Sequence, residues 1–126
     1  MTHRLCSANP RDLDGYLGVV RHEFLHVFGL QHTQTRWDRD KFVTVDEKNI
    51  KNDQLDQYEK CMDCDTLKAP YECNSIMHYD DTSNAINPNK KTMTPVDKKI
   101  CKINPGNDLT NWDWKLLRKA ANCPGS

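Results

Sequence analysis

The sequence predicts an α+β domain built from a few short elements and held together by disulfides. Apolar residues recur at helical spacing over residues 16–29, and a second helix signal begins at residue 110. One β-branched run, residues 42–45, is typical of a short strand. The remaining long segment, residues 61–108, contains four prolines and four of the six cysteines, which favours loops joined by cross-links. A length of 126 residues indicates one domain.

Composition excludes some classes of partner. The chain carries 18 acidic and 18 basic residues, so its formal net charge is zero and no electrostatic field favours nucleic acid or an anionic membrane. Only 37% of the residues are hydrophobic, and no apolar stretch approaches membrane-spanning length. We therefore expect no nucleic-acid partner and no membrane insertion. A chain this polar and this small buries a modest core, which is why cross-links are expected.

The first helix is predicted after a polar, turn-rich lead. Residues 1–15 include Asn9-Pro10 and Asp14-Gly15 and lack the apolar core of a signal peptide. Residues 16–29 then carry an apolar stripe at helical spacing, formed by Leu17, Val20, Phe24, Val27 and Phe28. This stripe explains how the helix packs.

The polar residues of the same helix predict a metal site. Residues from His22 to His32 read H-E-x-x-H-x-x-G-x-x-H. On an α-helix, His22 and His26 lie one turn apart, about 6 Å along the axis and about 40° around it. Both imidazoles can therefore bind one ion at the roughly 2.0–2.1 Å typical of Zn–N bonds. An ordinary amphipathic helix would not explain these histidines, so the spacing favours a metal.

The third histidine requires the helix to end. On a continuing helix, His32 would lie about 240° around the axis from His26 and about 9 Å further along it. We therefore expect a chain reversal at Gly29, because glycine readily adopts the left-handed conformation that such a reversal needs. Three protein nitrogens leave a fourth position open for water, which is typical of a catalytic zinc site.

Glu23 is the candidate general base. It follows His22 directly and lies about 100° around the helix, beside the metal rather than on it. From this position a carboxylate can take a proton from a water that the metal activates and pass it to a leaving amine.

The other elements are predicted from local signals. Residues 46–60 are charged, with a weak helical face formed by Ile50, Leu55 and Tyr58. The sequence from Thr110 to Asp113 resembles a capping box that starts a helix ending near Ala121.

Two interpretations of the cysteines differ. Cys61 and Cys64 form a C-x-x-C, which in a reducing compartment can bind metal or do redox work. No second C-x-x-C accompanies it, and the even cysteine count favours disulfides instead. We expect Cys61, Cys64, Cys73 and Cys101 to pair among themselves. Six cysteines allow 15 connectivities, so the pairing stays open.

Two motifs together resemble one family. After His32 the chain continues from Gln34 to Asp40 as QTRWDRD, and residues 75–79 read SIMHY. The extended zinc motif with an R-x-D-R-D stretch, followed by an S-I-M-H-Y Met-turn, resembles the astacin family of metzincin zinc endopeptidases. The resemblance spans residues 16–123. It implies a metzincin fold, with an active-site helix and a loop-rich, disulfide-stapled C-terminal subdomain.

The resemblance also implies roles for the Met-turn. Met77 would form the apolar floor beneath the zinc, and Tyr79 would be a fifth, displaceable metal ligand. A phenol released from the metal can donate a hydrogen bond to the oxyanion of a tetrahedral intermediate. His78 and His3 have no ligand role in the family pattern, and we interpret both as structural.

This chain departs from the family pattern in three ways. The family's N-terminal sheet subdomain is largely absent, so residues 1–126 are expected to form a single, partial peptidase domain. Thr33 stands where the family has a glutamate that is tied to the matured N-terminus. The cysteine that usually precedes the zinc helix aligns with Asp14, which leaves Cys6 as a substitute partner for Cys123.

Two functions follow from these residues. The preferred one is a secreted zinc endopeptidase acting on protein or peptide substrates, with one Zn²⁺ on His22, His26 and His32. The alternative is a truncated or degenerate zinc-binding module without turnover, which the missing subdomain and Thr33 favour. Intact Glu23 and Tyr79 favour the enzyme, because a site without catalysis has no chemical need for either. A purely structural module leaves the motif unexplained, and nothing in the sequence indicates an oligomeric state.

Overall fold

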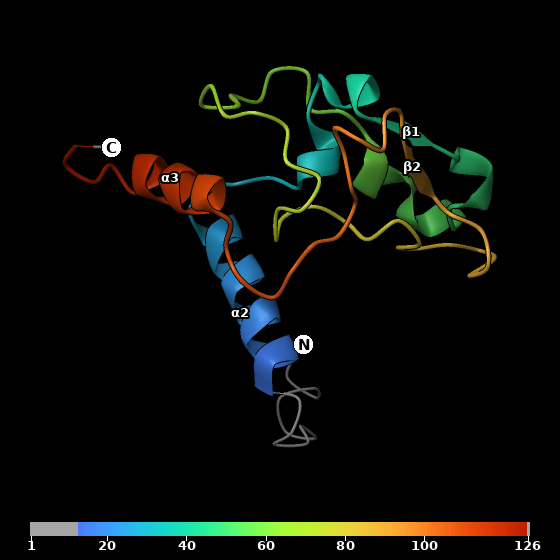
Figure 1. The fold of residues 1–126 in the computed structure, drawn as a ribbon, viewed down its shortest axis with the longest axis horizontal. Coiled ribbons are helices and arrows are strands. Elements are labelled where there is room, and N and C mark those ends of the chain that lie inside the picture. The colour runs from blue at the N-terminus through green and yellow to red at the C-terminus, as the bar shows by residue number, and fades with distance from the viewer. Residues whose placement is uncertain (1–12, 126) are drawn as a thin grey trace.

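The computed structural model describes residues 13–125 and confirms the α+β class (Figure 1). Helix α2 spans Leu13–Val27 and helix α3 spans Asn111–Ala120. Strands β1 (Val43–Val45) and β2 (Met93–Pro95) pair antiparallel, with Thr44 opposite Thr94. Short 3₁₀ helices occupy Thr33–Thr35, Arg39–Lys41, Glu47–Asn49 and Asn52–Tyr58. His3 and Cys6, for which the sequence suggested roles, lie outside the described residues.

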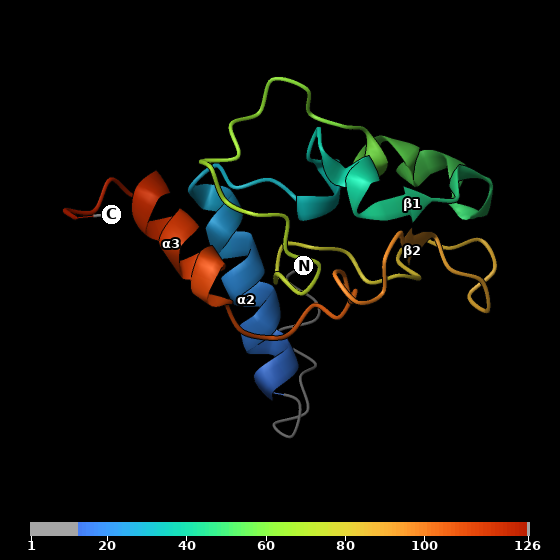
Figure 2. The ribbon, with the colours of Figure 1, turned by 45° about the horizontal axis from the view of Figure 1, so that its top comes forward.

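The described chain has two parts. Figures 1 and 2 show α2 and α3 side by side at one end and the two strands with their 3₁₀ helices at the other. The first turns of α2 extend away from the strands in both views. We call residues 42–103 the strand lobe, and α2 with α3 the helical part.

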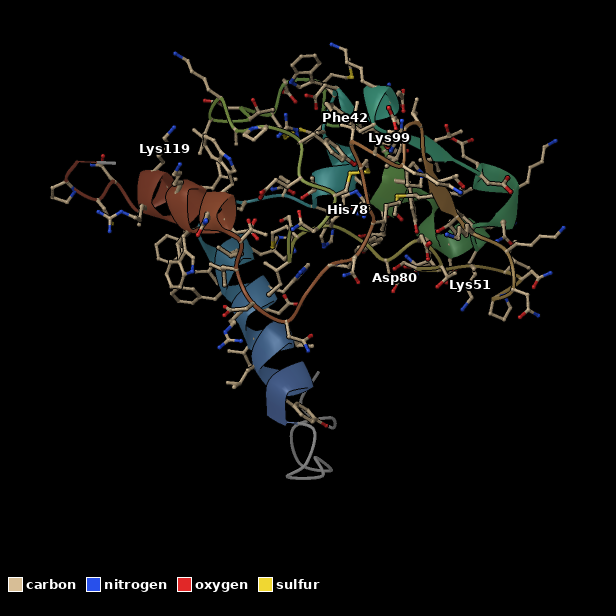
Figure 3. The ribbon with its side chains drawn as sticks, in the orientation of Figure 1. Phe42, Lys51, His78, Asp80, Lys99 and Lys119 are labelled. Carbon is tan, nitrogen blue, oxygen red and sulfur yellow. A yellow bond between two sulfur atoms is a disulfide. The ribbon has the colours of Figure 1, made fainter. Side chains whose placement is uncertain are left out.

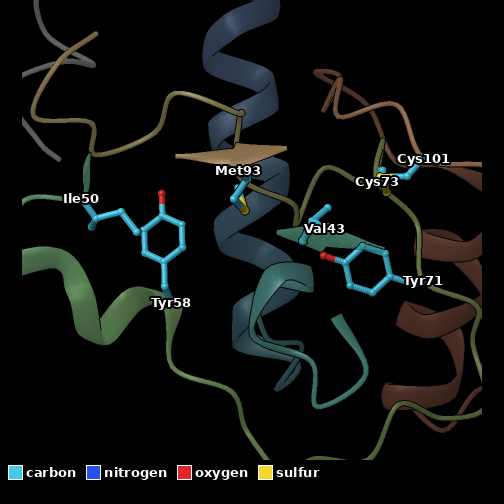
Figure 4. Close-up of a cluster of buried hydrophobic side chains, with 7 residues drawn as sticks. All are labelled: Val43, Ile50, Tyr58, Tyr71, Cys73, Met93 and Cys101. Atoms are coloured by element: carbon cyan, nitrogen blue, oxygen red, sulfur yellow. A yellow bond between two sulfur atoms is a disulfide. The ribbon is translucent and has the colours of Figure 1, made fainter. Parts of the chain in front are cut away.

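The strand lobe has the larger apolar core. Figure 4 shows this core, with the disulfide between Cys73 and Cys101 at one side of it. Phe42 stacks on Tyr71 with ring centroids 4.6 Å apart and covers one side. The buried members of this cluster are Val43, Ile50, Tyr58, Tyr71, Cys73, Met93 and Cys101.

A second, smaller core lies where the helical part meets the lobe, formed by Leu25 of α2 with Ile76 and Met77 of the Met-turn. Helix α3 joins it through a buried carboxylate, because Ser75 Oγ donates to Asp113 Oδ1 at 2.6 Å and Ile76 N–H donates to Oδ2 at 3.2 Å. Asp113 also forms the capping box with Thr110. One residue therefore starts α3 and attaches it to the Met-turn.

The described elements differ from the sequence-based expectations in three places. Helix α2 begins at Leu13, inside the expected polar lead, and ends at Val27 rather than residue 29. The weak helical face of residues 46–60 forms 3₁₀ turns, since Ile50 and Tyr58 are buried in the lobe core instead of lining an α-helix. Residues 93–95 were expected to be loop but form strand β2. The expectation failed because the strand's pairing partner lies about fifty residues earlier in the chain.

Both disulfides join cysteines within the expected set of four. Cys61 pairs with Cys64, and Cys73 pairs with Cys101. This confirms the preference for disulfides and resolves the connectivity among these four residues.

Candidate metal centre

Three histidine side chains converge beside the C-terminal end of α2. His22 and His26 project from successive turns, and their Nε2 atoms lie 3.1 Å apart. The Nε2 atom of His32 lies 3.0 Å from that of His22 and 3.1 Å from that of His26. The structure thus brings together the three histidines of the sequence motif.

The chain reversal that delivers His32 is a Schellman motif. Leu30 N–H donates to Leu25 O at 3.2 Å, and Gly29 N–H donates to His26 O at 2.9 Å. This 6→1 and 5→2 pattern ends the helix and requires a left-handed residue. Gly29 provides it, with φ of +84°. The glycine of the motif therefore has a conformational role, as expected.

Backbone carbonyls fix the orientation of two rings. His22 Nδ1 lies 2.7 Å from Ile76 O, and His26 Nδ1 lies 2.7 Å from Leu30 O. A carbonyl oxygen only accepts, so each Nδ1 carries a proton, and the neutral form of each ring then presents the Nε2 lone pair. Ring N–H groups bonded to backbone carbonyls in this way are typical of histidines that bind metal.

The geometry of the Nε2 atoms fits a cation. Once Nδ1 of His22 and His26 donates to carbonyls, their Nε2 atoms are both acceptors and cannot hydrogen-bond each other. Lone pairs this close repel unless a positive charge lies between them. Neutral imidazole nitrogens suit Zn²⁺ and other borderline divalent metals.

The third histidine is held neutral. Burial, and then the neighbouring His26, His22 and His78 rings, lower the pKa of His32 to about 4. At neutral pH its ring is therefore uncharged, which is the state that binds a metal.

Tyr79 and Met77 approach the cluster from the Met-turn. The Tyr79 ring lies 4.6 Å from the His32 ring, and its hydroxyl donates to Gln57 Oε1 at 3.4 Å. Met77 is buried in the small core, and its carbonyl accepts from Thr33 N–H at 3.0 Å. The Met-turn is thus hydrogen-bonded to the residue that follows the third histidine.

Glu23 is half-buried next to His22. The Glu23 carboxylate also acts on Tyr79. Burial raises the pKa of Tyr79 most, and the Asp56 and Glu23 carboxylates raise it further. Among residues 13–125, no side-chain hydrogen bond or ion pair engages the Glu23 carboxylate.

His78, labelled in Figure 3, is buried in the interior. It is bonded to Tyr71 Oη at 2.8 Å through Nε2 and to Tyr79 O at 2.6 Å through Nδ1. Burial lowers its pKa, so it stays neutral. Both ring nitrogens are used within the fold, which confirms the structural interpretation of His78.

Two clefts meet at the third histidine. The first, of about 380 Å³, extends toward α3, and the second, of about 350 Å³, extends toward the 3₁₀ helix Asn52–Tyr58. His32, Thr35 and Cys61 line both. His32 is therefore open to molecules larger than water, whereas His22 and His26 line neither of these two clefts.

The sequence did not single out Gln34, although it positions Tyr79. Its side chain is fully buried, and Oε1 accepts from Tyr79 N–H at 3.1 Å. Buried Arg39 donates to the Gln34 carbonyl at 3.1 Å. Burial of a single amide side chain leaves no periodic pattern in the sequence. The only available signal was the position of Gln34 within the QTRWDRD stretch.

The chain resembles known proteins over most of its length. Residues 14–122 match the peptidase family model described as Astacin. The chain is 33% identical to High choriolytic enzyme 1 of Oryzias latipes over 108 residues, which cover 86% of this chain and 40% of that protein. It is 40% identical to Zinc metalloproteinase nas-5 of Caenorhabditis elegans over 108 residues, covering 83% and 30% respectively.

A solved structure shares the fold. It is High choriolytic enzyme 1, described as a hatching enzyme zinc-protease from Oryzias latipes, and it matches with a TM-score of 0.78 at 33% identity. The match covers 84% of this chain and 52% of that one. The chain thus spans less than half the length of the curated relatives named above. No helix within residues 13–125 is long and apolar enough to cross a membrane. The chain belongs to the astacin family.

Proposed function

We propose that this chain carries the metal centre and the catalytic groups of a secreted zinc endopeptidase that cleaves proteins or peptides. The convergence of three Nε2 atoms within 3.1 Å carries this proposal. His22, His26 and His32 would hold one Zn²⁺. Relatives named as zinc metalloproteinase and zinc-protease support this choice of metal and reaction.

When bound, zinc supplies a Lewis acid that polarises the scissile carbonyl and lowers the pKa of the attacking water. The protein groups move the protons. Glu23 accepts a proton from that water as general base and delivers it to the leaving amine as general acid. Its carboxylate is suited to this because no hydrogen bond or ion pair within residues 13–125 engages it.

Tyr79 stabilises the developing oxyanion. Its raised pKa keeps the phenol protonated at neutral pH, so the hydroxyl can donate a hydrogen bond. The long bond to Gln57 at 3.4 Å is easily exchanged for a stronger one to the oxyanion. In the resting state Tyr79 is the proposed fifth metal ligand.

The proposed domain is partial, with residues 16–32 as the zinc segment, residues 75–79 as the Met-turn and residues 110–121 as the C-terminal helix.

The two disulfides support secretion, because such cross-links persist in oxidising compartments.

A second candidate is a zinc-binding module without turnover. Thr33 lacks the charge that the family has at this position. Such a module would bind zinc through the same histidines but would not hold a substrate productively.

Peptide cleavage separates the two candidates. The purified 126-residue chain is incubated with a quenched fluorescent peptide library and Zn²⁺, with and without a chelator, beside Glu23→Gln. We expect chelator-sensitive cleavage that Glu23→Gln lowers at least about a hundredfold, while zinc stoichiometry stays at one. Stoichiometric zinc with equal cleavage by both proteins would leave the binding module as the function.

A further inference from the structure

The disulfide between Cys61 and Cys64 lies at the junction of the two clefts. Cys61 lines both clefts, and Cys64 lines the one that extends toward α3. We propose that this disulfide is a thiol–disulfide exchange site that dithiol reductants open, and that its state sets how firmly the segment carrying His32 is held. The second step rests on the proposed metal site, whereas the first does not.

The environment of this disulfide favours exchange. Cys61 and Cys64 are half-buried, and Met62 between them is 70% exposed. Cys73 and Cys101 are 6% and 1% exposed and belong to the lobe core. Exchange requires a thiolate to reach a sulfur atom, so exposed disulfides are the labile ones. Cys61–Cys64 is therefore the disulfide that a reagent can reach without unfolding the lobe.

Opening this disulfide leaves the rest of the fold closed. It joins residues only three apart in sequence, whereas Cys73–Cys101 joins residues 28 apart. A loop this short restricts the unfolded chain much less than the longer one does. The Cys61–Cys64 bond thus constrains its own loop more than the domain.

Hydrogen bonds connect this loop to the third histidine. Cys61 N–H donates to Thr35 O at 2.7 Å, and Arg36 forms a parallel bridge with Cys61. Thr35 in turn donates to His32 O through both its N–H, at 3.0 Å, and its hydroxyl, at 2.8 Å. Two hydrogen-bonded steps therefore separate Cys61 from the backbone of His32.

One dithiol molecule supplies the two electrons and two protons that the exchange reaction needs. One thiolate of the reagent attacks a sulfur of the Cys61–Cys64 bond, which breaks and leaves a mixed disulfide. The second thiolate of the reagent then displaces the protein sulfur. The reagent leaves as a cyclic disulfide, having given two electrons, and two protons end on the Cys61 and Cys64 thiols. The freed loop then holds Thr35 less firmly.

Asp63 modulates this reaction. A carboxylate oxygen of Asp63 lies 3.4 Å from Cys61 Sγ. Both the attacking and the departing sulfur carry negative charge, so this carboxylate slows exchange. Asp63→Asn should react severalfold faster than the wild type.

The first test measures the order of opening. The oxidised 126-residue chain is equilibrated with increasing ratios of reduced to oxidised dithiothreitol, alkylated and analysed by peptide mass spectrometry. We expect Cys61 and Cys64 to be alkylated together at lower ratios than Cys73 and Cys101, while the near-ultraviolet circular dichroism persists. Opening of both disulfides in one step, or loss of the dichroism with the first, would overturn the proposal.

The second test measures the coupling to the histidines. Zn²⁺ affinity is determined by competition with a chromogenic chelator for Cys61→Ser/Cys64→Ser and for Met62→Ala, a control in the same loop. We expect a severalfold loss of affinity in the serine variant and none in the control. Equal affinities in two folded variants would overturn the coupling. A wild type that binds no zinc would refute the metal site instead, and the order of opening would still test the exchange site.

Discussion

The strand lobe and the helical part of this protein are held together in different ways. The lobe has a core of seven buried residues that includes a disulfide, whereas the helical part contributes Leu25 to a smaller core with the Met-turn and depends on Asp113 to attach α3. The expectation that the apolar stripe packs the helix is wrong for this chain, because Leu17, Val20, Phe24 and Val27 of α2 remain exposed, as does Phe28 just beyond its end.

The proposed metal site lies where these two parts meet. His22 and His26 come from α2, while Ile76 O, which orients His22, and Tyr79 come from the lobe side of the Met-turn. The comparison teaches that two of the three proposed ligands are attached to the part with the smaller core, and that one of them, His22, is oriented by a carbonyl of the strand lobe. Four predictions test this difference, from the largest expected effect to the smallest.

Removing the core disulfide should destabilise the lobe most. In the chain-entropy model, a cross-link between residues 28 apart contributes about 3.5 kcal/mol, and one between residues three apart about 2 kcal/mol or less. Cys73→Ala/Cys101→Ala should lower the free energy of unfolding by at least the larger amount, since both sites are buried. Urea unfolding measures this, with Cys61→Ser/Cys64→Ser as the control. Equal losses in the two variants would contradict a disulfide-dependent lobe.

Leu25→Ala should weaken the helical part. Leu25 is fully buried between α2 and the Met-turn, and truncating such a leucine costs about 3 kcal/mol. Because the two cores share no buried residue, the helical circular dichroism should be lost at lower urea than the tyrosine signal of the lobe. A single coincident transition would show instead that the two parts unfold as one unit.

Zinc should reduce the difference in stability against unfolding between the two parts. A ligand present at a hundred times its Kd stabilises the folded state by about 2.7 kcal/mol. The gain should appear in the helical signal, because two of the three ligands are on α2. Thermal unfolding with and without Zn²⁺ measures it, and His26→Ala is the control that should show no gain. An equal gain in that variant would place the zinc elsewhere.

Val27→Ser should have the smallest effect. Val27 is 79% exposed, and surface substitutions usually change stability by less than about 0.5 kcal/mol. The same urea titration measures this change. A loss above about 1 kcal/mol that grows with protein concentration would show that another copy of the chain covers this face of α2.

The parts of the fold that depend on local spacing could be predicted from the sequence. The helical separation of His22 and His26 and the reversal at Gly29 lie within eight residues, so helix geometry determines them. The capping box at Thr110 is equally local, and it is present.

The parts that depend on distant contacts could not be predicted. Pro95 argued against a strand, but it ends β2 opposite Val43. The carbonyl that orients His22 belongs to Ile76, 54 residues away. Burial of Gln34 depends on contacts with Tyr79 and Arg39, which no periodicity reveals.

The hydrogen bonds from His22 and His26 to backbone carbonyls have a consequence for the timing of metal uptake. Ile76 O and Leu30 O set the rotation and the proton position of both rings while the chain folds, before any ion arrives. The ordering entropy of these two proposed ligands is therefore lost in folding and not in binding. A chain stripped of its ion by a chelator should keep both rings in place, and reloading should be limited by diffusion of the ion rather than by rearrangement of the protein.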